Sequence, residues 1–253
     1  MIMSDFINTI DVLGDDAVID SIIDRTITEF KDDKLTNVNT YAFRNCDKLV
    51  TLDLPNVNFV GRLDLTSCSS LVNLSLPKVT SAPAMNGCSS IKSISFPLEN
   101  STTTSHFANC TSLESVDLPN ITFIGQGAFT NCTSLKRVCF PSVTSGLFMA
   151  FTNSGVEYAD FPVLETMDNA AFQNAKQLKS LLLRNNIVVA IKSTNVLNAT
   201  QIATGTGYIY VPKALVDSYK AATNWSTYAT RFRALEDYTV DGTITGELDE
   251  TKI

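Results

Sequence analysis

Apolar and polar positions repeat along the middle of this chain with a fixed period. Residues 128–143 read AFTNCTSLKRVCFPSV, and closely similar stretches stand before and after them. The proline that closes each stretch returns after 20 to 22 residues, at Pro55, Pro77, Pro97, Pro119, Pro141 and Pro162. A fixed period of this size predicts a solenoid, in which each unit is stable only when it is stacked on its neighbours.

The end of each unit alternates in the manner of a half-buried strand. In the first unit Leu52 and Leu54 fall on one face, with Thr51 and Asp53 on the other. Pro55 cannot donate a backbone hydrogen bond, so it marks the point where strand pairing stops. The A-F-x-N-C run before each strand is expected on the opposite wall, as a short turn or 3-10 segment with its Phe in the core.

Five of the six cysteines occupy one slot of the repeat. They are Cys46, Cys68, Cys88, Cys110 and Cys132, and Ser154 and Ala175 fill the same slot in later units. A slot that accepts Cys, Ser or Ala indicates a small, buried side chain. Thiols on units ~4.8 Å apart point the same way, which suits disulfide geometry poorly. We predict a buried column of thiols, with disulfides and a metal site as the alternatives. Cys139 lies outside the column and is the thiol expected to react.

The segment before the repeats has a different pattern. Asp15 and Asp16 precede apolar residues at helical spacing, which predicts a short helix, or a helix followed by a strand. We expect residues 1–36 to form an N-terminal helical cap over the first open repeat, because an uncovered end invites aggregation. The alternative is a docking helix for another protein.

About seven repeats occupy residues 37–187, and the pattern then ends. A turn is predicted at 205–207, a last strand at 208–211, and a helix that begins after Pro212. Residues 188–238 are therefore expected to form a C-terminal strand-helix cap, with Leu182 beneath it. Residues 239–253 form a polar tail that fits a disordered segment, a hairpin or a handle for a partner.

The repeat pattern A-F-x-N-C-x-S-L-x-x-L-x-L-P resembles the BspA-type leucine-rich repeat family over residues 37–187. That resemblance implies an α/β repeat fold, a right-handed leucine-rich-repeat solenoid with about 22 residues per repeat and a parallel sheet on one face. It also implies an adhesion or binding module and not an enzyme. The flanks at 14–28 and 207–232 are similar to members encoded by gut bacteria and their prophages, often near tail genes.

Composition narrows the classes of partner. The net charge is −7 and no basic run is present, which argues against nucleic acid. No stretch approaches the ~18 apolar residues of a membrane-spanning helix, so membrane insertion is not expected. The first residues, MIMSDFINTIDV, lack the positive region of a signal peptide. We expect a protein made in the cytoplasm without a signal peptide.

Candidate chemistry is sparse. His106 is the only histidine, so a histidine-pair metal site is impossible and a Ser-His-acid triad would have to use it. No G-x-S-x-G, P-loop or H-E-x-x-H motif is present. We therefore expect no catalytic residues, no metal and no cofactor, and interpret His106 as a structural or surface residue.

The outward face of the predicted sheet is the better candidate for function. Its candidate binding residues are Asn73, Ser93, Ser95, Ser115, Asp117, Arg137, Cys139, Tyr158 and Asp160. Short hydroxyls, amides and carboxylates on a solenoid face can hydrogen-bond an extended glycan or peptide. Arg137, Tyr158 and Asp160 are favoured, because Arg and Tyr dominate binding hot spots. The alternative is that these side chains only keep the sheet soluble.

These observations predict a non-enzymatic binding or adhesion module that recognises a protein or glycan on a cell surface. The familiar flanks and the start of the chain favour a phage tail or virion protein, with other virion subunits bound through the N-terminal cap or the C-terminal tail. The alternative is a bacterial cell-surface or secreted adhesin or scaffold.

Overall fold

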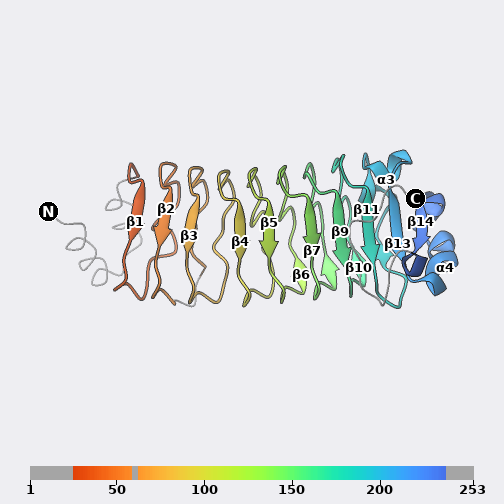
Figure 1. The fold of residues 1–253 in the computed structure, drawn as a ribbon, viewed down its shortest axis with the longest axis horizontal. Helices are drawn as coiled ribbons and strands as arrows, with labels where there is room; N and C mark the ends of the chain where they lie inside the picture. Colours follow the sequence, from red (N-terminus) through yellow and green to blue (C-terminus); the bar gives the residue numbers. More distant parts are fainter. Residues whose placement is uncertain (1–24, 59–61, 238–253) are drawn as a thin grey trace.

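The computed structural model describes residues 25–58 and 62–237. Successive repeats stand side by side along the long axis, and each adds one strand to a main wall of parallel strands (Figure 1). These strands are β1 (Glu29–Lys31), β2 (Thr51–Asp53), β3 (Asn73–Ser75), β4 (Ser93–Ser95), β5 (Ser115–Asp117), β7 (Arg137–Cys139), β9 (Tyr158–Phe161), β11 (Ser180–Leu183), β13 (Tyr208–Val211) and β14 (Phe232–Ala234). Hydrogen bonds group them as β1-β2-β3, β4-β5 and β7-β9-β11-β13-β14.

The strand register follows the apolar pattern. Leu52 and Leu54 are fully buried, whereas Thr51 and Asp53 on the other face are half-buried. In-register pairing joins equivalent slots of neighbouring repeats, such as Thr51 with Asn73. A slip of one residue would turn the apolar set toward solvent, so the core determines the register.

A second wall of two-residue strands was not predicted. It contains β6 (Phe123–Ile124), β8 (Ser145–Gly146), β10 (Thr166–Met167) and β12 (Ala190–Ile191), with β6 paired to β8 and β10 to β12. Two residues are too few to show an alternating pattern in the sequence. Gly146 is required here, because its φ is +103° and a Cβ would lie 2.3 Å from the Ile124 carbonyl oxygen.

The A-F-x-N-C runs form turns on the opposite wall, as expected, and their Phe side chains fill the core. The Asn slot has a positive φ, which Asn tolerates better than most residues; this slot holds Asn45, Ser67, Gly87, Asn109, Asn131, Asn153 and Asn174. Side-chain amides also bond from repeat to repeat. Asn131 donates to Asn109 at 2.8 Å, and Asn153 donates to Asn131 at 3.2 Å. We call Asn86, Asn109, Asn131 and Asn153 the asparagine ladder.

The predicted column of buried thiols is confirmed. All six cysteines are free, and only Cys139 is exposed. Each thiol from Cys68 to Cys132 donates to a backbone carbonyl of the preceding repeat; the Sγ of Cys68 lies 3.0 Å from the Phe43 oxygen. Burial raises the pKa of Cys68 to about 12, so these thiols are inert packing groups.

Short helices follow the last repeat at the C-terminal end (Figure 1). They are η1 (Thr194–Leu197), α3 (Gln201–Thr204), η2 (Lys213–Leu215), α4 (Val216–Ala221), η3 (Trp225–Arg231) and η4 (Leu235–Asp237). The predicted turn at 205–207, the strand at 208–211 and the helix after Pro212 are all present. Trp225 Nε1 donates to the Val189 carbonyl at 2.6 Å, which fixes this segment to the last repeat. Leu182 is 4% exposed and packs with Tyr210 and Leu235, as expected of a residue beneath the C-terminal segment.

At the other end, β1 supplies the strand that was one alternative for the N-terminal segment. Its Phe30 is buried against Phe43, with ring centroids 5.0 Å apart. The predicted helix after Asp15 and Asp16 falls mainly outside the described residues. The polar tail at 239–253 lies outside them as well.

Candidate binding site on the sheet face

The main wall carries all the predicted site residues at its surface. Exposed side chains are Asn73, Ser93, Ser95, Ser115, Asp117, Arg137 and Cys139, and Tyr158 and Asp160 are half-buried. They occupy the first and third positions of each strand, which face away from the core. Pairing places Arg137 beside Tyr158, and Cys139 beside Asp160.

One pocket of about 540 Å³ collects five of these residues. It opens over β5, β7, β9 and β11 and is lined by Ser115, Arg137, Cys139, Tyr158 and Asp160, together with Glu114, Leu182 and Arg184. We call this hollow the sheet pocket. It lies where the hydroxyl-rich strands give way to strands that carry larger side chains.

A cation–aromatic stack forms one side of the sheet pocket. The Arg137 guanidinium carbon lies 4.1 Å from the centroid of the Tyr158 ring, and the Lys179 Nζ lies 4.9 Å from it. Glu157 lies between two lysines, with its carboxylate 3.6 Å from Lys136 and 3.7 Å from Lys179. Pairing of β7 with β9 brings Arg137 to the Tyr158 ring, and the ion pair with Glu157 keeps Lys179 near the same ring.

Arg184 is a residue of the pocket that sequence reasoning missed. It donates to both carboxylate oxygens of Asp160, from Nε at 3.0 Å and from a terminal nitrogen at 2.7 Å. Such paired bonds combine strength with directional specificity. A signal was present, since Arg184 occupies the slot that holds proline in six preceding units, from Pro55 to Pro162.

The environment of Cys139 modifies the expectation about its reactivity. It is the exposed thiol among the six, which agrees with its position outside the buried column. Partial burial and the Asp160 carboxylate raise the pKa of the Cys139 thiol, and Arg184 opposes that change. Cys139 is thus accessible but holds its proton more tightly than an ordinary surface cysteine.

The remaining predicted residues are divided between two other places. Asn73 and Ser93 line a separate hollow of about 490 Å³ over β2, β3 and β4. Ser95 donates to the Asp117 carboxylate at 2.7 Å, and neither residue lines the two hollows. The structure thus places five of the nine predicted residues in one pocket.

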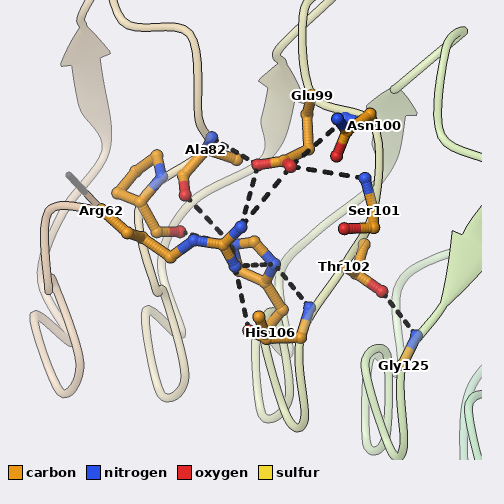
Figure 2. Close-up of polar contacts among 10 residues, drawn as sticks. Arg62, Ala82, Glu99, Asn100, Ser101, Thr102, His106 and Gly125 are labelled. Carbon is orange, nitrogen blue, oxygen red and sulfur yellow. Dashed lines mark hydrogen bonds and ion pairs between the residues drawn. The ribbon is translucent and has the colours of Figure 1, made fainter. Parts of the chain in front are cut away.

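His106 is a structural residue inside a polar cluster that also contains Arg62 and Glu99, and its side chain is 1% exposed. Figure 2 shows the three side chains pointing toward one another. The Thr103 N–H donates to His106 Nδ1 at 3.3 Å, and His106 Nε2 lies 2.9 Å from the Pro83 carbonyl oxygen. These contacts fit the tautomer with its proton on Nε2. Burial and the charge of Arg62 lower the pKa of His106 to about 4, so the ring is neutral near pH 7.

Glu99 replaces an aliphatic residue of the core. Its slot, two residues after the proline, holds Val57, Val79, Ile121, Val143 and Leu164 in other units. Its carboxylate accepts from the Ala82 N–H at 2.6 Å and from Arg62 at 3.3 Å (Figure 2). Four donor nitrogens make five contacts with this carboxylate, from Arg62 and from the amides of Ala82, Asn100 and Ser101, and they compensate for burying a charge.

In the described ranges 25–58 and 62–237, no group of three or more His, Cys, Asp or Glu side chains is arranged to hold a metal ion. No helix in that part of the chain is long and apolar enough to cross a membrane.

Comparison with known proteins identifies the repeats. The family model described as "BspA type Leucine rich repeat region" matches six copies, over residues 25–119 and 100–206. No curated protein matches the chain.

Three solved structures are similar. A leucine-rich repeat protein from Bacteroides ovatus ATCC 8483 is 20% identical with a TM-score of 0.41, over 70% of this chain and 59% of that one. The T. pallidum leucine-rich repeat protein is 20% identical with a TM-score of 0.41, over 76% and 82%. A leucine-rich cell surface protein from Faecalibacterium prausnitzii A2-165 is 16% identical with a TM-score of 0.37, over 79% and 76%. The chain thus spans 59% of the length of the B. ovatus protein.

Proposed function

The chain belongs to the BspA-type leucine-rich repeat family, and from this premise we propose that it is a non-enzymatic binding module that uses the outer face of its main wall. The observation that carries the proposal is the sheet pocket, in which Arg137 stacks on Tyr158 beside the Arg184–Asp160 pair. Arg and Tyr on a rigid face are typical anchors of binding hot spots. His106 is buried and neutral, which argues against a role in catalysis.

We propose a protein or glycan on a cell surface as the ligand, and the bacterial cell surface as the place of action. The family match supports a binding module of this kind. The placement on a phage tail or virion has weaker support. It rests on the flanks, and the family match covers only part of the first flank and ends before the second begins.

For the scaffold we propose the right-handed coil that the family implies, with about seven repeats of about 22 residues between 37 and 187. In-register partners from β1 to β11 are 21 or 22 residues apart, which supports this repeat length. We propose that 188–238 acts as a C-terminal cap, because α4 and η3 pack against the last repeat. An N-terminal helical cap at 1–36 stays a prediction.

The test is a sedimentation assay of labelled protein with whole bacterial cells, purified cell walls and mucin. The variant Arg137→Ala/Tyr158→Ala removes the stack, and Tyr41→Ala/Arg44→Ala is its matched control. In the control pair the Arg44 guanidinium lies 5.8 Å from the Tyr41 ring centroid, in a turn before β2. We expect binding that the first variant loses and the control retains. Binding unchanged in the first variant, or absent from the intact chain on all three materials, would contradict the proposal.

A further inference from the structure

Two tyrosines with cationic neighbours lie along the C-terminal part of the main wall. In-register pairing aligns Arg137 with Tyr158, Tyr158 with Ser180, and Ser180 with Tyr208. These residues belong to β7, β9, β11 and β13, which follow one another toward the C-terminal end (Figure 1). Two tyrosines of one column are thus separated by two strand steps, or ~10 Å.

Each tyrosine is flanked by two cations. Arg137 and Lys179 flank Tyr158, as described above, and two arginines flank Tyr208. The guanidinium carbon of Arg233 lies 4.1 Å from the Tyr208 ring centroid, and that of Arg231 lies 5.5 Å from it. We call Arg137, Tyr158, Lys179, Tyr208, Arg231 and Arg233 the tyrosine–cation row.

The two arginines at the end of the row are not neutralised by described carboxylates. Arg231 donates to Thr230 and to the Gly205 carbonyl, and Arg233 donates to the Thr230 and Phe232 carbonyls. Across residues 25–58 and 62–237 no ion pair joins either arginine to an acid.

Two acids in this part of the chain pair with cations outside the row, and a third is shared. Asp160 pairs with Arg184 at 2.7 Å, and Asp237 pairs with Lys213 at 3.4 Å. Glu157 contacts Lys179 of the row but is shared with Lys136. In a chain of net charge −7, this is a local concentration of positive charge on one face.

Apart from its two half-buried tyrosines, the row carries no large apolar side chain that could form the core of a protein interface. The exposed large hydrophobic residues of the described chain are Tyr41, Val50, Val72, Leu98, Phe123, Val163 and Ile187, and none lies on β7, β9, β11, β13 or β14. Protein interfaces have an apolar core inside a polar rim. A hydrophilic polymer needs only charge pairing and hydrogen bonds, and guanidinium groups pair with carboxylates through two parallel bonds.

We propose that the tyrosine–cation row binds an acidic polysaccharide, a chain with repeated carboxylate groups that runs across the strands from β7 to β14. Four strand steps give the row a length of ~19 Å, which suits several sugar units and not a single small anion. The proposal rests on the proposed function, since it names the chemical class of ligand for the same face. It extends that face beyond the sheet pocket to β13 and β14.

The experiment is affinity electrophoresis of the full chain through gels that contain polygalacturonate, neutral dextran or poly-glutamate. We expect retardation by polygalacturonate alone, and a roughly tenfold or greater loss of affinity when NaCl is raised from ~0.05 to ~0.5 M. Arg231→Gln/Arg233→Gln is expected to weaken binding at low salt roughly tenfold or more. Lys176→Gln/Lys220→Gln removes two charges outside the row and is expected to bind as the unmodified chain does. Equal thermal unfolding midpoints of the variants verify that the fold is retained.

Each other outcome has a defined meaning. Undiminished binding by Arg231→Gln/Arg233→Gln would overturn the location, and stronger retardation by poly-glutamate would replace the polysaccharide with an acidic peptide. If polygalacturonate does not bind, while cell binding still depends on Arg137 and Tyr158, the ligand class is wrong and the binding module stands. If polygalacturonate binds through the row but cells, walls and mucin do not, the row is supported and the cell-surface function fails.

Discussion

Two adjoining parts of the solenoid hold their repeats together by opposite means. From Phe107 to Phe172 the core carries one stacked phenylalanine per repeat, with successive ring centroids 5.4, 5.3 and 4.9 Å apart. Immediately before this phenylalanine stack, the cluster of Arg62, Glu99 and His106 occupies interior space that aliphatic and small residues fill elsewhere. The two parts meet where the His106 ring lies 4.2 Å from the Phe107 ring, almost parallel to it.

The difference shows what a repeat of this length demands of its interior. The phenylalanine stack is stabilised by burial and dispersion, which have no direction and do not depend on pH. The polar cluster depends on directional hydrogen bonds to backbone amides and on a neutral His106 ring. The two parts fill equivalent slots of successive repeats, so the repeat length is kept. Their responses to mutation and to acid differ.

The largest expected effect is in the phenylalanine stack. Phe129→Ala removes a fully buried ring that touches Phe107, Phe140 and Phe151. It should lower the free energy of unfolding by ~3–5 kcal/mol and reduce the cooperativity of unfolding between the repeats on either side of the cavity that the ring leaves. Urea unfolding followed by circular dichroism measures this, with Leu98→Ala at a 62% exposed position as the control. An unchanged midpoint for Phe129→Ala would show that this slot is not core.

Acid should destabilise the polar cluster but not the phenylalanine stack. The pKa of His106 is lowered to about 4 by burial and by Arg62, below the usual value of 6.5 in an unfolded chain. Between pH 4 and pH 6.5 the unfolded state binds more protons than the folded state does. The stability that the neutral His106 ring contributes is therefore complete above pH 6.5 and is lost as the pH falls toward 4. The total is about 3 kcal/mol.

The measurement is the free energy of unfolding from pH 8 to pH 4 for the intact chain and for His106→Gln. The variant is expected to be less stable at pH 8 and to lose less stability than the intact chain as the pH falls. Parallel curves for the two proteins would mean that His106 takes up its proton equally well in the folded and unfolded states.

The ion pair in the polar cluster should matter less than a ring of the stack. Arg62→Met leaves the Glu99 carboxylate, whose side chain is 3% exposed, without its cation. The expected loss is ~1–3 kcal/mol, because the backbone donors to Glu99 remain. Arg44→Met is the control, since its contact with Asp64 is 3.6 Å long and half exposed, and it should cost under ~1 kcal/mol. Equal losses of stability in the two variants would show that the buried ion pair contributes no more than the exposed one.

The smallest effect is expected on the outside of the turns, in the asparagine ladder. Asn131→Ala loses two amide contacts and places alanine at a φ of +62°, which should cost ~1–2 kcal/mol. Asn131→Gly loses the same contacts but tolerates that φ, so it should be less destabilising. The difference between the two thermal midpoints measures the cost of placing a residue with a Cβ at this positive φ. A glycine variant no more stable than the alanine variant would assign the effect to the ladder bonds.

Departures from the repeat explain what was missed in the sequence. Arg184 stands in the proline slot and Glu99 in an aliphatic slot, and neither was singled out. His106, which was interpreted as a structural or surface residue, stands in the alanine slot. Each departure was readable in the alignment of the repeats, but its consequence was not. Nothing in the order of residues shows that Arg184 reaches back to Asp160, or that Arg62 reaches forward to Glu99 across 37 residues.

The sequence by itself determined the repeat, the buried column of thiols and the slots that face outward on the main wall. It could do so because these features follow from local periodicity, and stacking copies the same environment into every unit. The second wall of β6, β8, β10 and β12 was beyond its reach, since two-residue strands carry too little pattern. Only the tertiary structure decided which outward side chains meet, because contacts between repeats depend on side-chain reach and direction. The sheet pocket, the tyrosine–cation row and the buried polar cluster are therefore properties of the folded solenoid and not of any single repeat.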